Sequence, residues 1–238
     1  MAADLGSADG QCRQIYSQAI DNLNRLRAPE EKQSPKKQGI ELLNRAGDIC
    51  LAEAEAAAEP HRAAELAAIA YKSRSRLVVY TKDGDRRAIL KEAIDFIAGF
   101  EHDRSPALPE ILKELAYLEW TEDRPYSVKL MERAIDIHRT HFGPHDPRVA
   151  EKISQLGFLY APSHLPRSDP GTRKDLRQAE SLYREALEIH LKAKSTESHP
   201  NFRKTMELLQ ELLIGTERAE EAMGLKRLLD GEQSPAGP

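Results

Sequence analysis

Three histidines and an aspartate lie close together in the sequence and are the residues best suited to bind a metal ion. His138 and His141 are three residues apart and share one face of a helix, and His145 and Asp146 follow just after it. Imidazole nitrogens and carboxylates are ligands that zinc accepts. The alternative is that all four are solvated or capping residues near a connection between helices. This second interpretation is favoured, because His138 has a counterpart in a sequence repeat described below, and no metal or cofactor is expected.

Six cations between residues 72 and 87 form a second candidate site, for an anionic partner. They are Lys72, Arg74, Arg76, Lys82, Arg86 and Arg87. Because no exposed aromatic residues are interleaved with them, the stretch resembles a phosphate or acidic-peptide patch more than a platform for single-stranded nucleic acid. The favoured alternative is a solvated face whose cations pair with the acidic run Glu53, Glu55, Glu59 and Glu65.

Composition excludes several classes of protein. Lys and Arg number 35 against 39 Asp and Glu, which gives a net charge of −4 and a pI near 6.1, so that nucleic acid is an unlikely main partner. The mean hydropathy is −0.60, and no apolar run approaches the roughly 18 residues that span a bilayer. The sequence contains no nucleotide-binding glycine motif, no nucleophile elbow and no H-E-x-x-H or C-x-x-C motif, so no enzyme activity is expected.

The two cysteines and the N-terminal residues indicate a cellular compartment. Cys12 and Cys50 are the only thiols among 238 residues, which fits a reduced compartment and argues against a scaffold held by disulfides. Residues 1–10 lack the cationic and apolar regions of a secretory signal. We therefore expect a cytoplasmic protein with free thiols and no association with a membrane.

Apolar residues recur at helical spacing along almost the whole chain. Only residues 77–80 look like a strand, and they continue the helical spacing of Leu66 and Ile69. Proline, glycine and aspartate clusters divide the chain and predict an all-α protein of ten helices. The predicted spans are 8–27, 36–58, 61–81, 85–98, 108–121, 125–141, 147–160, 174–194, 200–214 and 217–230.

An internal repeat occupies the second half of the sequence. Residues 130–138, which end at His138, align with residues 182–190, which end at His190, at an offset of 52. Downstream, the pair 146–147 aligns with the pair 199–200 at an offset of 53. Self-similarity of a helical hairpin at a nearly fixed offset is typical of an α-solenoid.

At these residues the sequence resembles the tetratricopeptide repeat (TPR) family in its kinesin-light-chain-like form. The resemblance rests on residues 156–160 of one helix, on Ala179, Tyr183 and Ala186 of the next, and on the connection 143–147. It is good over about 107–230 and only architectural over 8–100. It implies that Gly157 and Ala179 are small where helices approach closely, and that residues 1–230 form one right-handed superhelical domain followed by a disordered tail, 231–238.

The family implies a concave wall lined by the first helix of each hairpin. By family phasing, the side chains on this wall are Lys113, Tyr117, Ser154, Phe158, Lys204, Glu207 and Glu211. Tyr117 and Phe158 occupy positions where chaperone-tail binders carry asparagine, so that ligand is disfavoured. Tyr117 and Phe158 can equally be packing residues.

The resemblance implies a non-enzymatic protein-interaction module or scaffold that binds a peptide or an extended segment of a partner. The alternative is a structural assembly subunit that packs on a folded protein or on a second copy. RNA binding and metal dependence are the least favoured functions. The proline-containing connection 161–172 is either an arm that contacts a partner or a tolerated surface loop. The sequence identifies neither the partner nor the oligomeric state.

Overall fold

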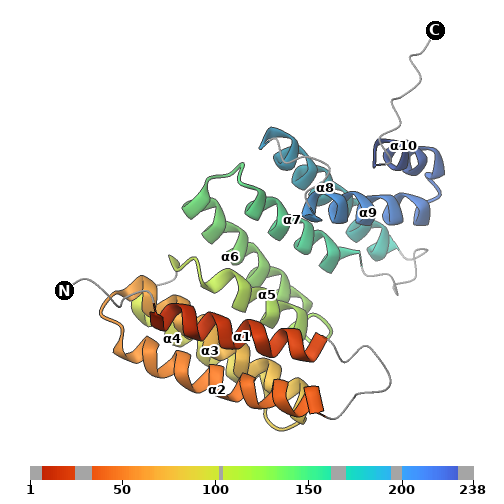
Figure 1. Ribbon diagram of the computed structural model, residues 1–238. Coiled ribbons are helices and arrows are strands. Elements are labelled where there is room, and N and C mark those ends of the chain that lie inside the picture. The colour runs from red at the N-terminus through yellow and green to blue at the C-terminus, as the bar shows by residue number, and fades with distance from the viewer. Residues whose placement is uncertain (1–6, 25–33, 102–103, 162–169, 194–199, 230–238) are drawn as a thin grey trace. The chain divides into compact units, whose positions relative to one another are not determined.

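The computed structural model describes residues 7–24, 34–101, 104–161, 170–193 and 200–229. In these ranges the chain forms ten α-helices and no strand, as the apolar spacing predicts (Figure 1). The helices are α1 (Ser7–Asn24), α2 (Ser34–Ala56), α3 (Pro60–Thr81), α4 (Arg86–Glu101), α5 (Leu108–Glu119), α6 (Arg124–Phe142), α7 (Pro147–Tyr160), α8 (Pro170–Lys192), α9 (Pro200–Gly215) and α10 (Ala219–Leu229).

The chain divides into two compact units, Met1–Leu118 and Glu119–Pro238. Each unit is described by itself. The predicted single domain over 1–230 and the predicted superhelix across it therefore remain predictions.

In the first unit, each helix packs on the next along the chain from α1 to α4, and α1 also packs on α3. Contact between successive first helices, such as α1 and α3, is the arrangement that stacked hairpins require. Small residues allow this close packing, because Ala63, Ala64, Ala67 and Ala70 of α3 are fully buried. Ala19 and Leu23 of α1 meet Leu43 of α2 in a small apolar cluster.

The second unit repeats this pattern. Helices α6 to α10 pack in succession, and α7 also packs on α9. The core of the last hairpins is formed by Leu176, Ala179, Tyr183 and Leu187 of α8 together with residues of α9 and α10. His138 and His190, which are aligned in the sequence repeat, are both buried.

Gly157 of α7 lies against the ring of Tyr183 on α8. A Cβ atom placed on Gly157 would lie 2.7 Å from Tyr183 Cε1, closer than real Cβ contacts come. A larger residue would therefore push α7 and α8 apart. This confirms the close approach that the resemblance implies for Gly157.

The helix ends follow the predicted breakers. Asp123 and Asp146 cap α6 and α7, each accepting a hydrogen bond from a backbone N–H, of Tyr126 and Arg148 respectively. The strand-like residues 77–80 are helical, and α3 ends at Lys82, which adopts a left-handed conformation with φ 62°. Helix α8 begins at Pro170, not at residue 174 as predicted, because proline is accepted in the first turn of a helix.

The expectation of free thiols is wrong. Cys12 of α1 and Cys50 of α2 form a disulfide, with their Cα atoms 5.6 Å apart. The two residues are 38 apart in the sequence, and they meet because α1 and α2 pack side by side. Spacing alone could not reveal this pairing, and the compartment inferred from the thiols loses its basis.

Most of the proline-containing connection, residues 162–169, and the tail from residue 230 onward lie outside the described residues. The predictions made for these two segments are therefore not addressed by the structure.

Replacing Gly157 with alanine should destabilise the second unit. Overpacking against Tyr183 costs about 1–3 kcal/mol, and the higher helix propensity of alanine returns about 1 kcal/mol, so that a net loss of up to about 2 kcal/mol is expected in urea denaturation.

Gly224→Ala in α10 is the matched control, because no atom lies within 4 Å of a Cβ atom built there. This substitution should be neutral or stabilise by up to about 1 kcal/mol. Equal effects of the two substitutions would contradict the packing of Gly157 described above.

Candidate functional site

The six cations predicted to bind an anionic partner are mostly engaged within the first unit. Arg74 lies 3.8 Å from Asp48 of α2 and over the ring of Tyr71. Arg86 donates a hydrogen bond to Ser75 and lies 3.6 Å from Glu114 of α5. Arg87 donates to the backbone oxygen of Leu118.

Lys72 and Arg76 face carboxylates and a phenol of neighbouring helices. Partial burial lowers the pKa of Lys72, and the nearby carboxylates Glu110 and Glu114 of α5 oppose this shift. Arg76 is hydrogen-bonded to Tyr16 of α1, whose pKa is raised mainly by its own burial. Lys82 is exposed at the end of α3.

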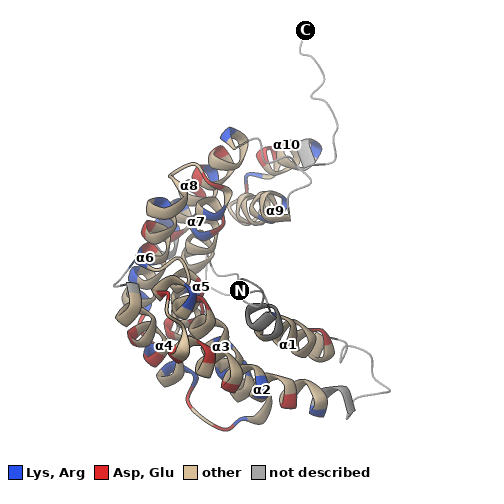
Figure 2. Cartoon of the chain, turned by 60° about the vertical axis from the view of Figure 1, so that its left-hand side comes forward, with Lys and Arg blue, Asp and Glu red and all other residues tan. Residues whose placement is uncertain are grey.

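The acids that face these cations include Asp48, Glu110 and Glu114. Pairing with the acidic run of residues 53–65 stays a prediction. Figure 2 shows cationic and anionic residues interspersed along the helices. The cations connect helices α1 to α5 of the first unit, which leaves little of the predicted anionic-partner patch free.

The predicted wall residues of α5 differ in exposure. Lys113 is mostly buried and pairs with Glu110 one turn before it. Tyr117, one turn after Lys113, is 39% exposed. Of the two predicted wall residues on α5, Lys113 and Tyr117, Tyr117 is the one with a large side chain exposed to solvent.

In the second unit, α7 and α9 share a line of polar contacts. Ser154 is nearly fully buried, and its hydroxyl oxygen accepts a hydrogen bond of 3.0 Å from Thr205. Glu151 accepts hydrogen bonds from Asn201 of α9 and from Gln155 of its own helix. Ser154 thus joins the two helices instead of facing a ligand, and Glu151, Gln155 and Asn201 are surface residues that the sequence prediction missed.

Beside this line lie the other predicted wall residues of the second unit. Phe158 of α7 is 43% exposed, so that a large aromatic side chain lies at the surface. On α9, Lys204, Glu207 and Glu211 follow at helical spacing, and Lys204 and Glu207 form an exposed ion pair of 3.7 Å. Phe158, Lys204 and Glu211 are exposed, and Glu151, Gln155 and Glu207 are partly buried. We call these six residues the α7–α9 face.

The histidine cluster does not assemble a metal site. Asp146 accepts two hydrogen bonds from the Arg148 guanidinium, which holds the pKa of the carboxyl below its ordinary value. His138 Nδ1 lies 3.3 Å from the backbone oxygen of Arg148, and its ring packs on Phe142. Over the described ranges, no group of three His, Cys, Asp or Glu side chains is arranged to hold a metal ion.

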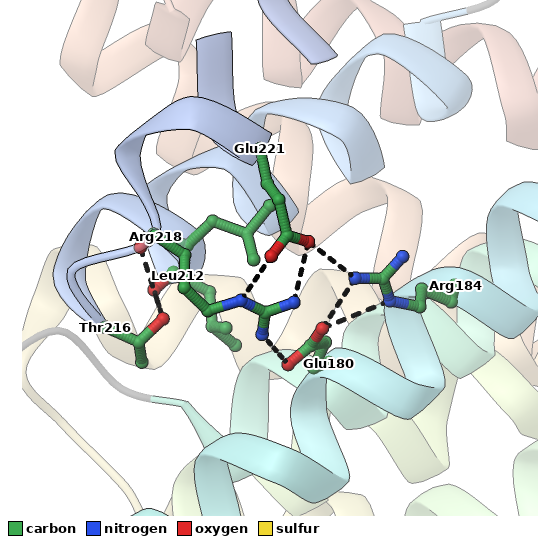
Figure 3. A network of polar contacts seen from close by, with 7 residues as sticks. Glu180, Arg184, Leu212, Thr216, Arg218 and Glu221 are labelled. Carbon is green, nitrogen blue, oxygen red and sulfur yellow. Dashed lines mark hydrogen bonds and ion pairs between the residues drawn. The ribbon is translucent and has the colours of Figure 1, made fainter. Parts of the chain in front are cut away.

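A network of four charged residues joins α8 to the start of α10 (Figure 3). Arg218 donates hydrogen bonds to Glu180 and Glu221, and Arg184 donates to Glu180 and lies 3.4 Å from Glu221. Burial raises the pKa of Glu180, but the hydrogen bonds from Arg218 and Arg184 outweigh this, so that its pKa lies below the ordinary value of 4.5. The network fastens α10 to α8 through Arg218, the residue just before α10.

Two solved structures resemble the chain along nearly their whole length. BtubC (BKLC) from P. vanneervenii has a TM-score of 0.59 at 12% identity, and the match covers 98% of this chain and 96% of that one. A kinesin light chain from Podosopora anserina with nearly identical TPR-like repeats has a TM-score of 0.61 at 15% identity, covering 94% and 95%. The chain therefore has the fold of TPR-like helical repeats.

No protein-family model and no curated protein matches the sequence. Every helix in the described part of the chain is too short or too polar to cross a membrane.

The Glu180 network should stabilise the last hairpin in a pH-dependent way. Glu180→Gln should lower stability by about 1 kcal/mol at pH 7, because the pairs are partly screened by solvent. Since the folded-state pKa of Glu180 is depressed, this contribution is complete above its ordinary value of 4.5 and disappears as pH falls through the folded-state value. This contribution is measured by comparing hydrogen exchange of α9 and α10 in wild type and Glu180→Gln between pH 7 and pH 3.

Glu188→Gln is the matched control, because Glu188 lies on the same helix and pairs only locally with Lys192. It should leave exchange of α9 and α10 unchanged. If the difference in hydrogen exchange of α9 and α10 between wild type and Glu180→Gln grew toward low pH, the stabilising role given to Glu180 would be contradicted.

Proposed function

We propose that this chain is a non-enzymatic protein-interaction scaffold that binds an extended segment of a partner protein on the α7–α9 face. The observation that carries the proposal is Phe158, a large aromatic side chain that is 43% exposed on a first helix of the repeat. Aromatic residues of this kind supply much of the binding energy of protein interfaces. The fold supports an interaction role in general, because TPR-like hairpins present continuous surfaces built from many helices.

The polar residues around Phe158 suit a peptide ligand. Glu151, Gln155 and Asn201 are tied to one another by hydrogen bonds of 2.9 and 3.0 Å, so that their positions are defined before a ligand arrives. Preorganised polar groups around an apolar anchor favour specific recognition, because less conformational entropy is lost on binding. Lys204, Glu207 and Glu211 of α9 add charges of both signs at the edge of the face.

A second candidate function is assembly with a second copy or a larger folded protein through the last hairpin. Ile214 of α9 is 57% exposed and Met223 of α10 is 52% exposed. Exposed apolar residues suit packing against another protein surface. Sedimentation velocity across a range of protein concentrations distinguishes this function, since only self-assembly makes the mass depend on concentration.

The proposed binding face can be tested with paired variants. Phe158→Ser combined with Lys204→Glu should weaken capture of native partners by about 30-fold or more, the effect of losing an aromatic hot spot. The measurement is quantitative mass spectrometry of captured proteins, followed by calorimetry with synthetic peptides that tile the captured partner.

The matched control is Leu191→Ser combined with Lys192→Glu on α8. Leu191 is 66% exposed, and the Lys192 side chain is 52% exposed and ion-paired like that of Lys204. This control should retain the partners. If both double variants lose the same proteins, or neither loses any, the α7–α9 face is not the binding site.

A further inference from the structure

The disulfide between Cys12 and Cys50 joins two helices at the N-terminal end of the first unit. Both residues are fully buried, and 38 positions of sequence separate them. A crosslink over a loop of this length strongly restricts how far α1 can move from α2. In a chain with these two cysteines alone, the crosslink acts on this hairpin and nowhere else.

Besides the disulfide, helix α1 is held through one apolar face. Its buried residues other than Cys12 are Ile15, Ala19 and Leu23, and Tyr16 and Ile20 are partly buried beside them. Arg13 pairs with Glu65 of α3 at 2.6 Å, but both side chains are substantially exposed, and such a pair contributes little. Helix α1 packs mainly on α2 and α3, so its release would leave the contact between α3 and α4 in place.

Helix α2 packs more extensively on α3 than on α1, and α3 packs in turn on α4. The loss of α1 would therefore leave α2 and α3 with their own contacts. Helix α1 can therefore open as a local unit while α2, α3 and α4 remain packed on one another.

We propose that the Cys12–Cys50 disulfide is a redox latch: it holds α1 on α2 and α3 when oxidised, and its reduction by a cellular thiol such as glutathione releases α1. A reductant thiolate attacks one sulfur and forms a mixed disulfide, and the other cysteine leaves as a thiolate that takes up a proton. A second reductant thiol then resolves the mixed disulfide. Two reductant thiols become one disulfide, and Cys12 and Cys50 each gain a hydrogen.

The burial of both cysteines couples this chemistry to motion. A thiolate cannot reach either sulfur while α1 covers Cys50, so that exchange requires α1 to open first. After reduction, reclosing is no longer favoured by the crosslink, and the helix remains open more often. Re-formation of the disulfide likewise requires α1 to be packed on α2, because the two sulfur atoms meet only in that arrangement.

Release of α1 would uncover a defined surface. Leu43 of α2 would lose its contacts with Ala19 and Leu23, and Gly39, against which Leu23 packs closely, would be exposed. Arg76 of α3 would lose its hydrogen bond to Tyr16. The uncovered surface is thus an apolar strip of α2 beside a free guanidinium of α3.

Hydrogen exchange of the full chain, read by mass spectrometry, tests the latch. The oxidised protein is compared with the same protein kept in a phosphine reductant and with Cys12→Ala/Cys50→Ala, which needs no reductant. Protection in residues 7–24 should fall by about 100-fold in both reduced forms, while α3 and α4 change little. The second unit contains no cysteine and serves as the internal control.

Two outcomes would overturn the proposal. Equal protection of α1 in the oxidised and reduced protein would show that the bond does not control its docking. Loss of protection throughout α1 to α4 would show that the bond stabilises the whole unit and does not act as a latch. If α1 loses the same protection in the reduced wild type and in the alanine variant, a cavity left by the substitution is not the cause of that loss. The test does not depend on a partner, so it can fail or succeed independently of the proposed function.

Discussion

Close approach of helices at small side chains is the constraint on which the rest of this structure depends. Gly157 meets the ring of Tyr183 with no room for a methyl group, and the alanines of α3 are buried without exception along one seam. When two helices are this close, larger side chains must point to other faces. The small residues therefore determine which side chains remain on the surface and which polar groups of neighbouring helices meet.

The polar contacts follow from this packing. Cations of α3 and α4 lie beside acids of α2 and α5, and Arg218 bridges two carboxylates of α8 and α10. Because these charges are compensated between helices, they stabilise the stacking of hairpins more than they offer a site for an anion. The α7–α9 face differs, since an exposed phenylalanine there lies beside polar residues that are already held in place.

Much of the fold could be predicted from sequence, because helical periodicity and breakers are local signals. Nine of the ten predicted helix starts lie close to the observed ones. The family resemblance also identifies Gly157 as a position where two helices approach closely. Contacts between residues distant in sequence could not be predicted in the same way. The Cys12–Cys50 bond, the burial of Ser154 against Thr205 and the partners of the basic stretch depend on which helix faces pack together, and local sequence patterns do not show which faces meet.

The central claim is that first helices of the second unit form the binding face and second helices support it. Hydrogen exchange of the chain with and without a saturating partner peptide measures this most directly. The account predicts added protection in α7 and α9, around Phe158 and Lys204, with α8 and α10 unchanged. Protection confined to α8 and α10 would contradict it.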